Sequence, residues 1–257
     1  MGCSSYQKVT ELESFTQNHG HDRPFVVRQG CSELNANKRW SMPYLLQHMG
    51  DVTVGVEVED PEKNDMSMEF IDQTIMTFQE YYALQKKAKA YITEYNTINL
   101  PDTLLNDLGS ELDSIDGLRN EMLFVGSRGT SSAFHMHGID DFITCIVFGK
   151  KEMFFFDSFE IGVFTSHPPM NIRKEFFEKY AKLLNVSHVV LKAGDGVFIP
   201  PWWYHSAKNL DFTVAVTKIY ARYDLRYAVR SLSIFVETIK SYINRWIKYA
   251  KVLLGIA

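Results

Sequence analysis

The chain has 257 residues, of which 46% are hydrophobic and 23% charged, and its formal net charge at pH 7 is −4. This composition is that of a folded globular protein with a substantial core, and the net charge excludes a surface coated with positive charge for nucleic acid. No apolar run reaches the roughly 18 residues that a membrane-spanning helix needs. The N-terminus also lacks the basic-then-apolar pattern of a secretory signal.

The cysteines predict neither a disulfide framework nor a cysteine zinc site. Cys3, Cys31 and Cys145 lie far apart in the sequence and form no CxxC pair. Such cysteine usage fits a reducing environment. We therefore expect an intracellular, cytoplasmic protein.

The N-terminal part is expected to alternate short strands and helices after a polar loop over residues 1–21. Ser41 is the predicted N-cap of a first helix that ends at Gly50, and Thr77 with Glu80 forms a capping box for a second helix. Apolar or alternating patterns predict the strands. The predicted strands are 25–30 and 51–59, and the predicted helices are 39–50 and 77–89.

From about residue 121 the sequence changes to short apolar runs separated by glycine-containing turns, which is typical of a β-sandwich or barrel. A helix over residues 171–184, with Asn171 as its N-cap, is predicted to interrupt these runs. The predicted strands are 121–129, 143–148, 152–157, 188–200 and 212–220.

The C-terminal segment is predicted to be a long amphipathic helix, or two helices with a break. Apolar side chains recur at steps of three and four from Leu225 to Leu254. Residues 225–257 contain six basic and one acidic residue, a net of +5, so the remainder carries −9. Such a helix could pack against the domain or a twin subunit, lie on an anionic membrane surface, or bind RNA.

Two histidines one residue apart, in "SSAFHMHGIDD", are the first candidate site. On a strand, His135 and His137 project from one face, because side chains alternate at period two. A metal needs a third ligand, and the segment "GDGVFIPPWWYH" supplies His205. Two ligands on one strand and a third on a distant strand form a facial site that leaves the other side of the ion open.

The segments "LFVGSRGTSSAFHMH", "GKKEMFFFD" and "GDGVFIPPWWYH" resemble the cupin-like Jumonji-C oxygenases, in the branch that hydroxylates asparagine of hypoxia-inducible factor and wybutosine of tRNA. The likeness covers residues 22–222. It implies a mainly β fold with flanking helices, a double-stranded β-helix with N-terminal α/β elements, that binds Fe(II), 2-oxoglutarate and O2. It also implies that the helices of 223–257 form a homodimer.

The iron ligands are where the sequence departs from the family. His135 and His205 match the two family histidines, whereas His137 stands where the family has aspartate. Three neutral histidines leave an Fe(II) site at +2 instead of +1, which changes the redox properties of the metal and also suits zinc. Asp141, or less favourably Asp140, is an alternative source of the carboxylate.

The resemblance also implies residues that hold the distal carboxylate of 2-oxoglutarate. They are Lys151, with Lys150 as the alternative, Ser132 and Tyr91. A cation with two hydroxyl donors is a suitable carboxylate clamp.

The sequence therefore predicts a non-haem iron oxygenase that uses 2-oxoglutarate to hydroxylate or otherwise oxidise a C–H bond. One alternative is a three-histidine metalloenzyme, an iron dioxygenase or another, that does not use 2-oxoglutarate. Another is a non-catalytic cupin-like binding protein. The substrate is a small molecule or a protein side chain, with RNA left open, because a fold does not select a substrate.

Overall fold

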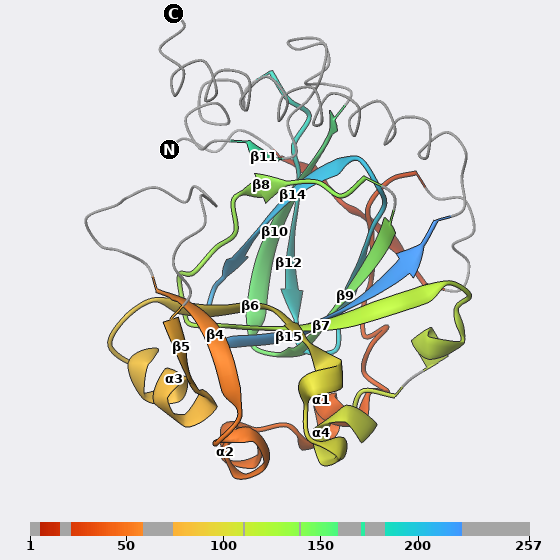
Figure 1. Cartoon of the computed structure of the whole chain (residues 1–257). Coiled ribbons are helices and arrows are strands. Elements are labelled where there is room, and N and C mark those ends of the chain that lie inside the picture. The colour runs from red at the N-terminus through yellow and green to blue at the C-terminus, as the bar shows by residue number, and fades with distance from the viewer. Residues whose placement is uncertain are drawn as a thin grey trace, which may run out of the picture.

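The computed structural model describes residues 6–15, 22–58, 74–109, 111–138, 140–158, 171–172 and 183–222 (Figure 1). Within these ranges no helix has the length and apolarity needed to cross a membrane. The C-terminal segment 223–257, for which we predict an amphipathic helix and a homodimer, lies outside the described residues.

Two β-sheets make up most of the described fold. The smaller sheet has six strands, in the order β1 (Gln7–Lys8), β12 (Ser187–Lys192), β10 (Lys150–Asp157), β14 (Trp203–Asn209), β8 (Phe134–His135) and β11 (Asn171–Ile172). The larger sheet has nine, in the order β2 (Thr10–Leu12), β3 (Phe25–Val27), β13 (Gly196–Ile199), β9 (Asp140–Phe148), β15 (Thr213–Ala221), β7 (Leu118–Gly126), β6 (Ala90–Asn96), β4 (Thr53–Val58) and β5 (Thr74–Thr77). The pairings are antiparallel except β1–β12 and β2–β3.

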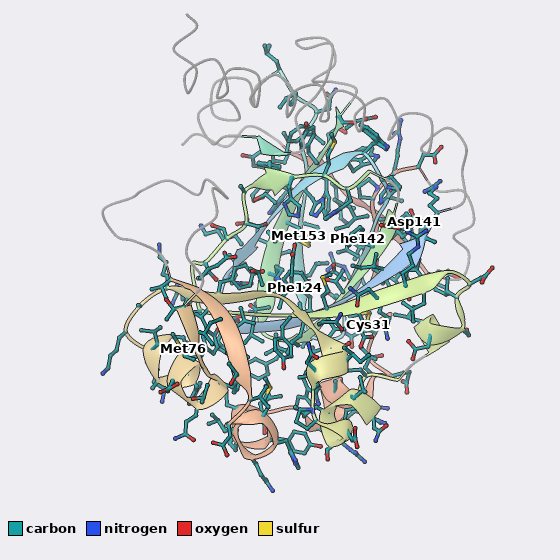
Figure 2. The ribbon with its side chains drawn as sticks, viewed as in Figure 1. Cys31, Met76, Phe124, Asp141, Phe142 and Met153 are labelled. Atoms are coloured by element: carbon teal, nitrogen blue, oxygen red, sulfur yellow. A yellow bond between two sulfur atoms is a disulfide. The ribbon has the colours of Figure 1, made fainter. Side chains whose placement is uncertain are left out.

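The two sheets enclose an apolar layer, and this arrangement confirms the predicted double-stranded β-helix. Side chains from both sheets meet in one cluster, including Met153 of β10, Val189 of β12 and Val197 of β13. Figure 2 shows Phe124, Phe142 and Met153 in the space between the sheets. Burial of these side chains supplies the main stabilisation of the barrel.

Helices cover the outer side of the larger sheet (Figure 1). They are α1 (Asn35–Arg39), α2 (Met42–Met49), α3 (Phe78–Leu84), α4 (Asp102–Asn106) and the 3₁₀ turns η1 (Thr97–Asn99) and η2 (Glu111–Ser114). The predicted caps are confirmed, since the Ser41 side chain accepts from Tyr44 N, Gly50 is the C-cap of α2, and Thr77 with Glu80 forms the capping box of α3. Helix α3 ends at Leu84, before the predicted residue 89, because the chain turns there toward β6.

Three expectations about local structure were wrong. Residues 1–21 are not simply a loop, because β1 and β2 lie within them. Asn171 is not a helix N-cap, because it pairs with His135 as part of β11, and the predicted helix after it lies outside the described residues. The predicted strand 188–200 is two strands in different sheets, β12 and β13, joined by a turn at Gly194, whose φ of +88° favours glycine. In each case the deciding contact is a long-range strand pairing that a local pattern does not contain.

The expectation that the cysteines are unpaired was also wrong. Cys31 and Cys145 form a disulfide with their Cα atoms 5.8 Å apart, although the two residues are 114 positions apart in the sequence. Both side chains are buried in the core between the larger sheet and the helices. No spacing motif could indicate this pair, since the fold alone brings the loop after β3 against β9. The cysteines therefore no longer support the expected reducing compartment.

Candidate metal centre

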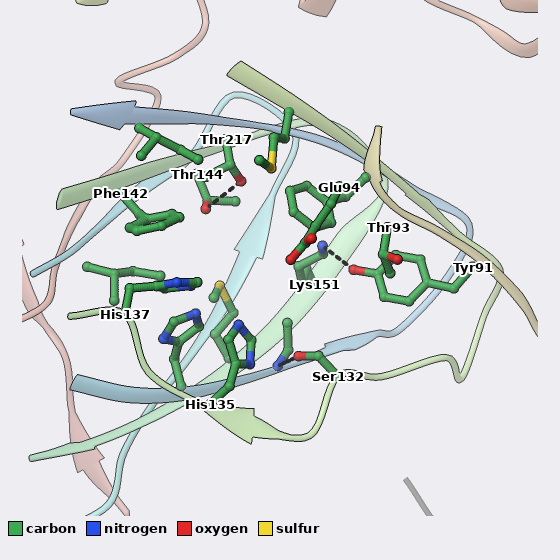
Figure 3. Close-up of a pocket in the computed structure, with 17 residues that line it drawn as sticks. Tyr91, Thr93, Glu94, Ser132, His135, His137, Phe142, Thr144, Lys151 and Thr217 are labelled. Atoms are coloured by element: carbon green, nitrogen blue, oxygen red, sulfur yellow. Dashed lines mark hydrogen bonds between the residues drawn. The ribbon is translucent and has the colours of Figure 1, made fainter. Parts of the chain in front are cut away.

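A cavity of about 250 Å³ lies between the two sheets and collects most of the predicted site residues (Figure 3). Its walls are largely apolar. The apolar side chains that line it include Met122, Phe124, Phe142, Met153, Ile199 and Ile219, and the polar ones include Tyr91, Glu94, Ser132, Thr144, Lys151, Thr217 and the three histidines. A cavity with apolar walls and few polar groups is the usual form of a small-molecule site.

The structure brings the three predicted histidines together. His135 on β8 pairs directly with His205 on β14, and their ring centroids are 4.2 Å apart. The ring of His137 lies 5.1 Å from that of His135 and 5.2 Å from that of His205. One nitrogen of each ring can be chosen so that all three lie within 4.8 Å of one another. Both histidines line the cavity while Met136 between them packs into a separate apolar cluster, as predicted, although β8 ends at His135 and the pair does not share one strand.

Backbone carbonyl groups fix which nitrogen of two rings is free. The Nδ1 atom of His135 lies 3.0 Å from the Ala133 carbonyl oxygen, and Nδ1 of His205 lies 3.1 Å from that of Trp203. A carbonyl oxygen can only accept, so each Nδ1 carries the hydrogen and each Nε2 keeps its lone pair for a ligand. Such outer hydrogen bonds orient imidazoles in metal sites.

Burial keeps the histidines neutral. It lowers the pKa of His135, although the Ala133 carbonyl and the charge of Glu94 oppose this effect. It lowers the pKa of His137 to about 3, helped by repulsion from His135. The pKa of His205 is also well below its ordinary value, through burial and the two neighbouring rings. The site thus offers three uncharged nitrogen donors at neutral pH, as metal binding requires.

The two aspartates considered as ligands are engaged elsewhere. The Asp141 carboxylate accepts a hydrogen bond from Arg222 Nη1 at 3.0 Å, and burial still raises its pKa to about 6. Asp140 accepts from Arg119 Nη1 at 3.2 Å. In the described part of the chain, the only group of His, Cys, Asp and Glu side chains close enough to share an ion is the three histidines.

Lys151 lies in the same cavity as a buried cation. Its side chain is 3% exposed, and Nζ donates to the Tyr91 hydroxyl at 3.3 Å. No carboxylate within the described residues forms an ion pair with it, and burial lowers its pKa to about 8. The alternative, Lys150, is exposed. Burial therefore decides in favour of Lys151, which lines the cavity, whereas Lys150 does not. The turn before both lysines requires glycine at Gly149, whose φ is +80° and where a Cβ would lie 2.1 Å from the Phe212 carbonyl oxygen.

Ser132 lines the cavity as predicted. Its hydroxyl oxygen accepts from Ala207 N at 3.1 Å, which leaves its hydrogen for donation to a ligand. Figure 3 shows Lys151, Tyr91 and Ser132 along one side of the cavity, next to the histidines.

Four polar residues of the cavity were missed in the sequence, and Thr93 on β6 is one of them. Thr144 on β9 and Thr217 on β15 are hydrogen-bonded to each other at 2.9 Å and are buried. The alternation of side chains could have revealed both threonines, since each is a polar residue at a position of an apolar strand that faces the cavity. Glu94 on β6 also lines the cavity, and period-two alternation places it on the opposite face.

The chain matches known proteins over most of its length. It is 26% identical over 234 residues to the protein of Arabidopsis thaliana named Arginine-specific demethylase JMJ22, a match that covers 82% of this chain and 44% of that protein. It is 24% identical over 237 residues to the protein of Mus musculus named 2-oxoglutarate and iron-dependent oxygenase JMJD4, covering 79% of this chain and 52% of that protein. The chain thus spans about half the length of these relatives.

A family assignment follows from a further match. The cupin-like domain family matches residues 11–223. This range begins before the expected boundary at residue 22, in agreement with the presence of β2, and it ends next to the expected boundary at 222. The matched range includes every strand from β3 to β15 and every residue of the cavity, and the chain therefore belongs to the cupin-like domain family.

Proposed function

We propose that this protein is a non-haem Fe(II) oxygenase that uses 2-oxoglutarate and O2 to hydroxylate or otherwise oxidise a C–H bond. The observation that carries this proposal is a buried lysine, with no acidic partner among the described residues, in the same cavity as three convergent histidines. The cavity has a place for a metal and, beside it, a place for an acid. The name of the JMJD4 relative, a 2-oxoglutarate and iron-dependent oxygenase, supports the same function.

The chemistry of the donor set fits Fe(II). His135, His137 and His205 are neutral, and the hydrogen bonds to Ala133 and Trp203 leave the Nε2 atoms of two rings free. The ring of His137 stacks on Phe142 with centroids 3.9 Å apart, which restrains its orientation. Three imidazole donors on one side of an ion leave the other side open to small ligands.

Charge favours a dianionic acid in this cavity. Three neutral donors leave a ferrous site at +2, Lys151 adds one positive charge when protonated, and the Glu94 carboxylate that lines the same cavity offsets one, so the net charge is +2. A dianion neutralises the metal site, and one of its carboxylates meets a cation that is otherwise buried without a counter-charge, a costly arrangement. The hydroxyls of Tyr91 and Ser132 supply further polar contacts, and the volume of about 250 Å³ suits a small acid.

The residues of this chain would bind the metal ion, orient the acid and exclude water. When bound, iron would supply the activation of O2, coupled to the conversion of 2-oxoglutarate to succinate and CO2, with one oxygen atom passing to the C–H bond. The histidines hold the ion, and Lys151 fixes the far end of the acid. The apolar wall that includes Phe124, Phe142 and Ile219 keeps bulk water from the reacting atoms.

The test is metal analysis combined with detection of succinate. Protein loaded anaerobically with Fe(II) should bind one equivalent and, on addition of O2 and 2-oxoglutarate, form succinate. His205→Ala should lose both properties. His188→Ala is the matched control, because His188 lies on β12 outside the cavity and contacts Glu152 at 2.9 Å, and it should retain both.

Two other outcomes identify the alternatives. Metal binding without O2-dependent succinate would favour a three-histidine metalloenzyme, with zinc or iron, that does not use 2-oxoglutarate. Absence of metal binding would favour a non-catalytic cupin-like binding protein. In the first of these cases, increased 2-oxoglutarate turnover in His137→Asp would show that the native three-histidine site is not tuned for this acid.

A further inference from the structure

Glu94 reaches the cavity because β6 contains a bulge. In the pairing of β6 with β7, Ile92 is opposite Val125 and Tyr95 is opposite Leu123. The register shifts between these pairs, so Thr93 and Glu94 together face one residue of β7. A bulge of this kind can re-aim a side chain, and bulges are frequent beside active sites.

The bulge changes the face on which Glu94 lies. Tyr91 and Thr93 line the cavity, whereas Ile92 and Tyr95 pack into the core between the larger sheet and the helices. In a regular strand, residue 94 would follow Ile92 onto that apolar face. Instead Glu94 lines the cavity as well (Figure 3).

The backbone of Glu94 adopts an unfavourable conformation at the position from which the side chain lines the cavity. Its φ is +53°, in the left-handed region that residues other than glycine rarely occupy. Conformations of this kind cluster at functional sites, where surrounding structure holds them. The bulge thus places a charged side chain at the cavity at a cost in backbone energy.

The Glu94 carboxylate has no partner within the described part of the chain. No hydrogen bond or ion pair engages it, and the nearby Thr93 hydroxyl donates instead to Glu57 at 2.7 Å. The side chain is exposed, whereas Lys151 is buried, so Glu94 lies at the mouth of the cavity and Lys151 at its inner end. The charge of Glu94 nevertheless acts on the ring of His135.

We propose that Glu94 is a specificity-determining residue that selects substrates carrying a positively charged group. This inference rests on the proposed function, because it places the substrate at the open side of the metal site. A free carboxylate at the mouth attracts a cation and repels an acidic substrate. Glu94 and the three histidines line the same cavity, so one substrate could place a cationic group at Glu94 and a C–H bond at the metal.

A different role for Glu94 is to offset the positive charge of the metal and Lys151. That role would alter the affinity for metal or for 2-oxoglutarate, and it would not distinguish a cationic probe from a neutral one of the same shape. The two roles therefore give different results when such a pair of probes is compared.

The experiment uses Mn(II)-loaded protein with 2-oxoglutarate under anaerobic conditions. The probes are N-acetyl-lysine methylamide and N-acetyl-norleucine methylamide, which share an apolar stem and differ by the ammonium group. Broadening of the probe resonances by the paramagnetic ion gives the dissociation constant of each. The lysine probe should bind about fivefold more tightly than the norleucine probe, the strength of a partly exposed ion pair, and added salt should reduce this difference.

Glu94→Gln should bring the ratio of the two dissociation constants close to one. Glu94→Gly should do the same, and this variant relieves the left-handed backbone, so it keeps the test informative if the glutamine variant folds poorly. Glu33→Gln is the matched control, since Glu33 is an exposed acid outside the cavity that pairs with Lys38, and its ratio should equal that of the wild type.

The outcomes separate this inference from the proposed function. A wild-type chain that binds Mn(II) and treats both probes alike, or a Glu94→Gln variant that keeps the preference, overturns the role of Glu94 alone. A chain that binds no metal, by elemental analysis, overturns the proposed function and this inference with it.

Discussion

Lys151 and Lys218 are both buried, yet their surroundings differ. Lys218, on β15, is 1% exposed, and its Nζ donates to Asp113 at 2.6 Å, to Glu121 and to the Leu108 carbonyl. Lys151, on β10, is 3% exposed, and its one hydrogen bond is to the neutral Tyr91 hydroxyl. A buried ammonium normally has a carboxylate partner. Acidic side chains pair with the first lysine, whereas the second pairs with none among the described residues and is the one that we propose binds the acid.

The comparison separates a structural charge from a binding charge. Lys218 ties β15 to η2 and β7, so its neutralisation is internal. Lys151 lines a cavity, and burial depresses its pKa to about 8, because removal from water disfavours the charged form. An anionic ligand would restore that charge. The difference between the two lysines is therefore best examined by removing each in turn.

The largest effect is expected for Lys151→Met. Affinity for 2-oxoglutarate should fall roughly 100-fold or more, because a buried charge-assisted contact is lost. Thermal stability should stay equal or rise, because the variant removes a buried charge without an acidic partner. Anaerobic titration calorimetry with Mn(II)-loaded protein, together with thermal denaturation, measures both.

The matched control for this variant is Lys150→Met, next in sequence but exposed. It should bind 2-oxoglutarate like the wild type. Unchanged affinity in Lys151→Met, or an equal loss in both variants, would show that Lys151 is not the acid-binding cation.

Lys218→Met should give the opposite pair of results. The free energy of unfolding should fall by about 2 kcal/mol, because Glu121 and Asp113 lose their common partner. This figure is below that of a fully buried pair, since the Asp113 side chain is 39% exposed. Affinity for 2-oxoglutarate should not change. Chemical denaturation measures the first quantity, and a variant as stable as the wild type would remove the contrast between the two lysines.

Sequence reasoning found the candidate site residues by two routes: alternation along a strand indicated the HxH pair, whereas the resemblance to the Jumonji-C oxygenases implied Lys151. His135 and His137 share a face by alternation, and Lys151 follows a glycine turn into a strand. The caps at Ser41 and Thr77 were predictable for a similar reason, since capping depends on side chains only a few positions apart.

The features that escaped prediction depend on contacts between distant segments. The Cys31–Cys145 disulfide joins residues 114 positions apart. Glu94 faces the cavity because of a bulge in the pairing of β6 with β7, and a bulge breaks the alternation on which strand predictions rest. Asn171 would have been a reasonable helix cap, but its backbone pairs with β8. Local pattern and family resemblance indicated the candidate ligands, whereas these surrounding features depend on tertiary pairing.

The pH dependence of acid binding should follow the titration of Lys151. Burial lowers the pKa of Lys151 to about 8 in the free protein. The protonated form binds the dianion, so affinity should be constant below about pH 8 and should fall as the lysine loses its proton above it. The loss at pH 9 should be roughly tenfold. Burial raises the pKa of Tyr91, which therefore stays neutral over this range.

Calorimetric titrations of 2-oxoglutarate from pH 6.5 to 9.5 measure this profile. In Lys151→Met the profile should be flat above pH 8. An affinity in the wild type that holds constant to pH 9.5 would mean that the charge of Lys151 does not contribute to binding.

The smallest effect is expected for Tyr91→Phe, which removes only the hydroxyl that accepts from Lys151 Nζ at 3.3 Å. A net hydrogen bond contributes about 1 kcal/mol, so 2-oxoglutarate should bind roughly fivefold more weakly. If Tyr91 acts by orienting the lysine, its substitution should change little in a chain that already carries Lys151→Met. The double-variant cycle measures this coupling. Tyr81→Phe is the control, because the Tyr81 hydroxyl donates to the Val125 carbonyl at 2.8 Å outside the cavity. Equal losses for Tyr91→Phe in both backgrounds would mean that the phenol contacts the acid directly and that Lys151 is oriented without it.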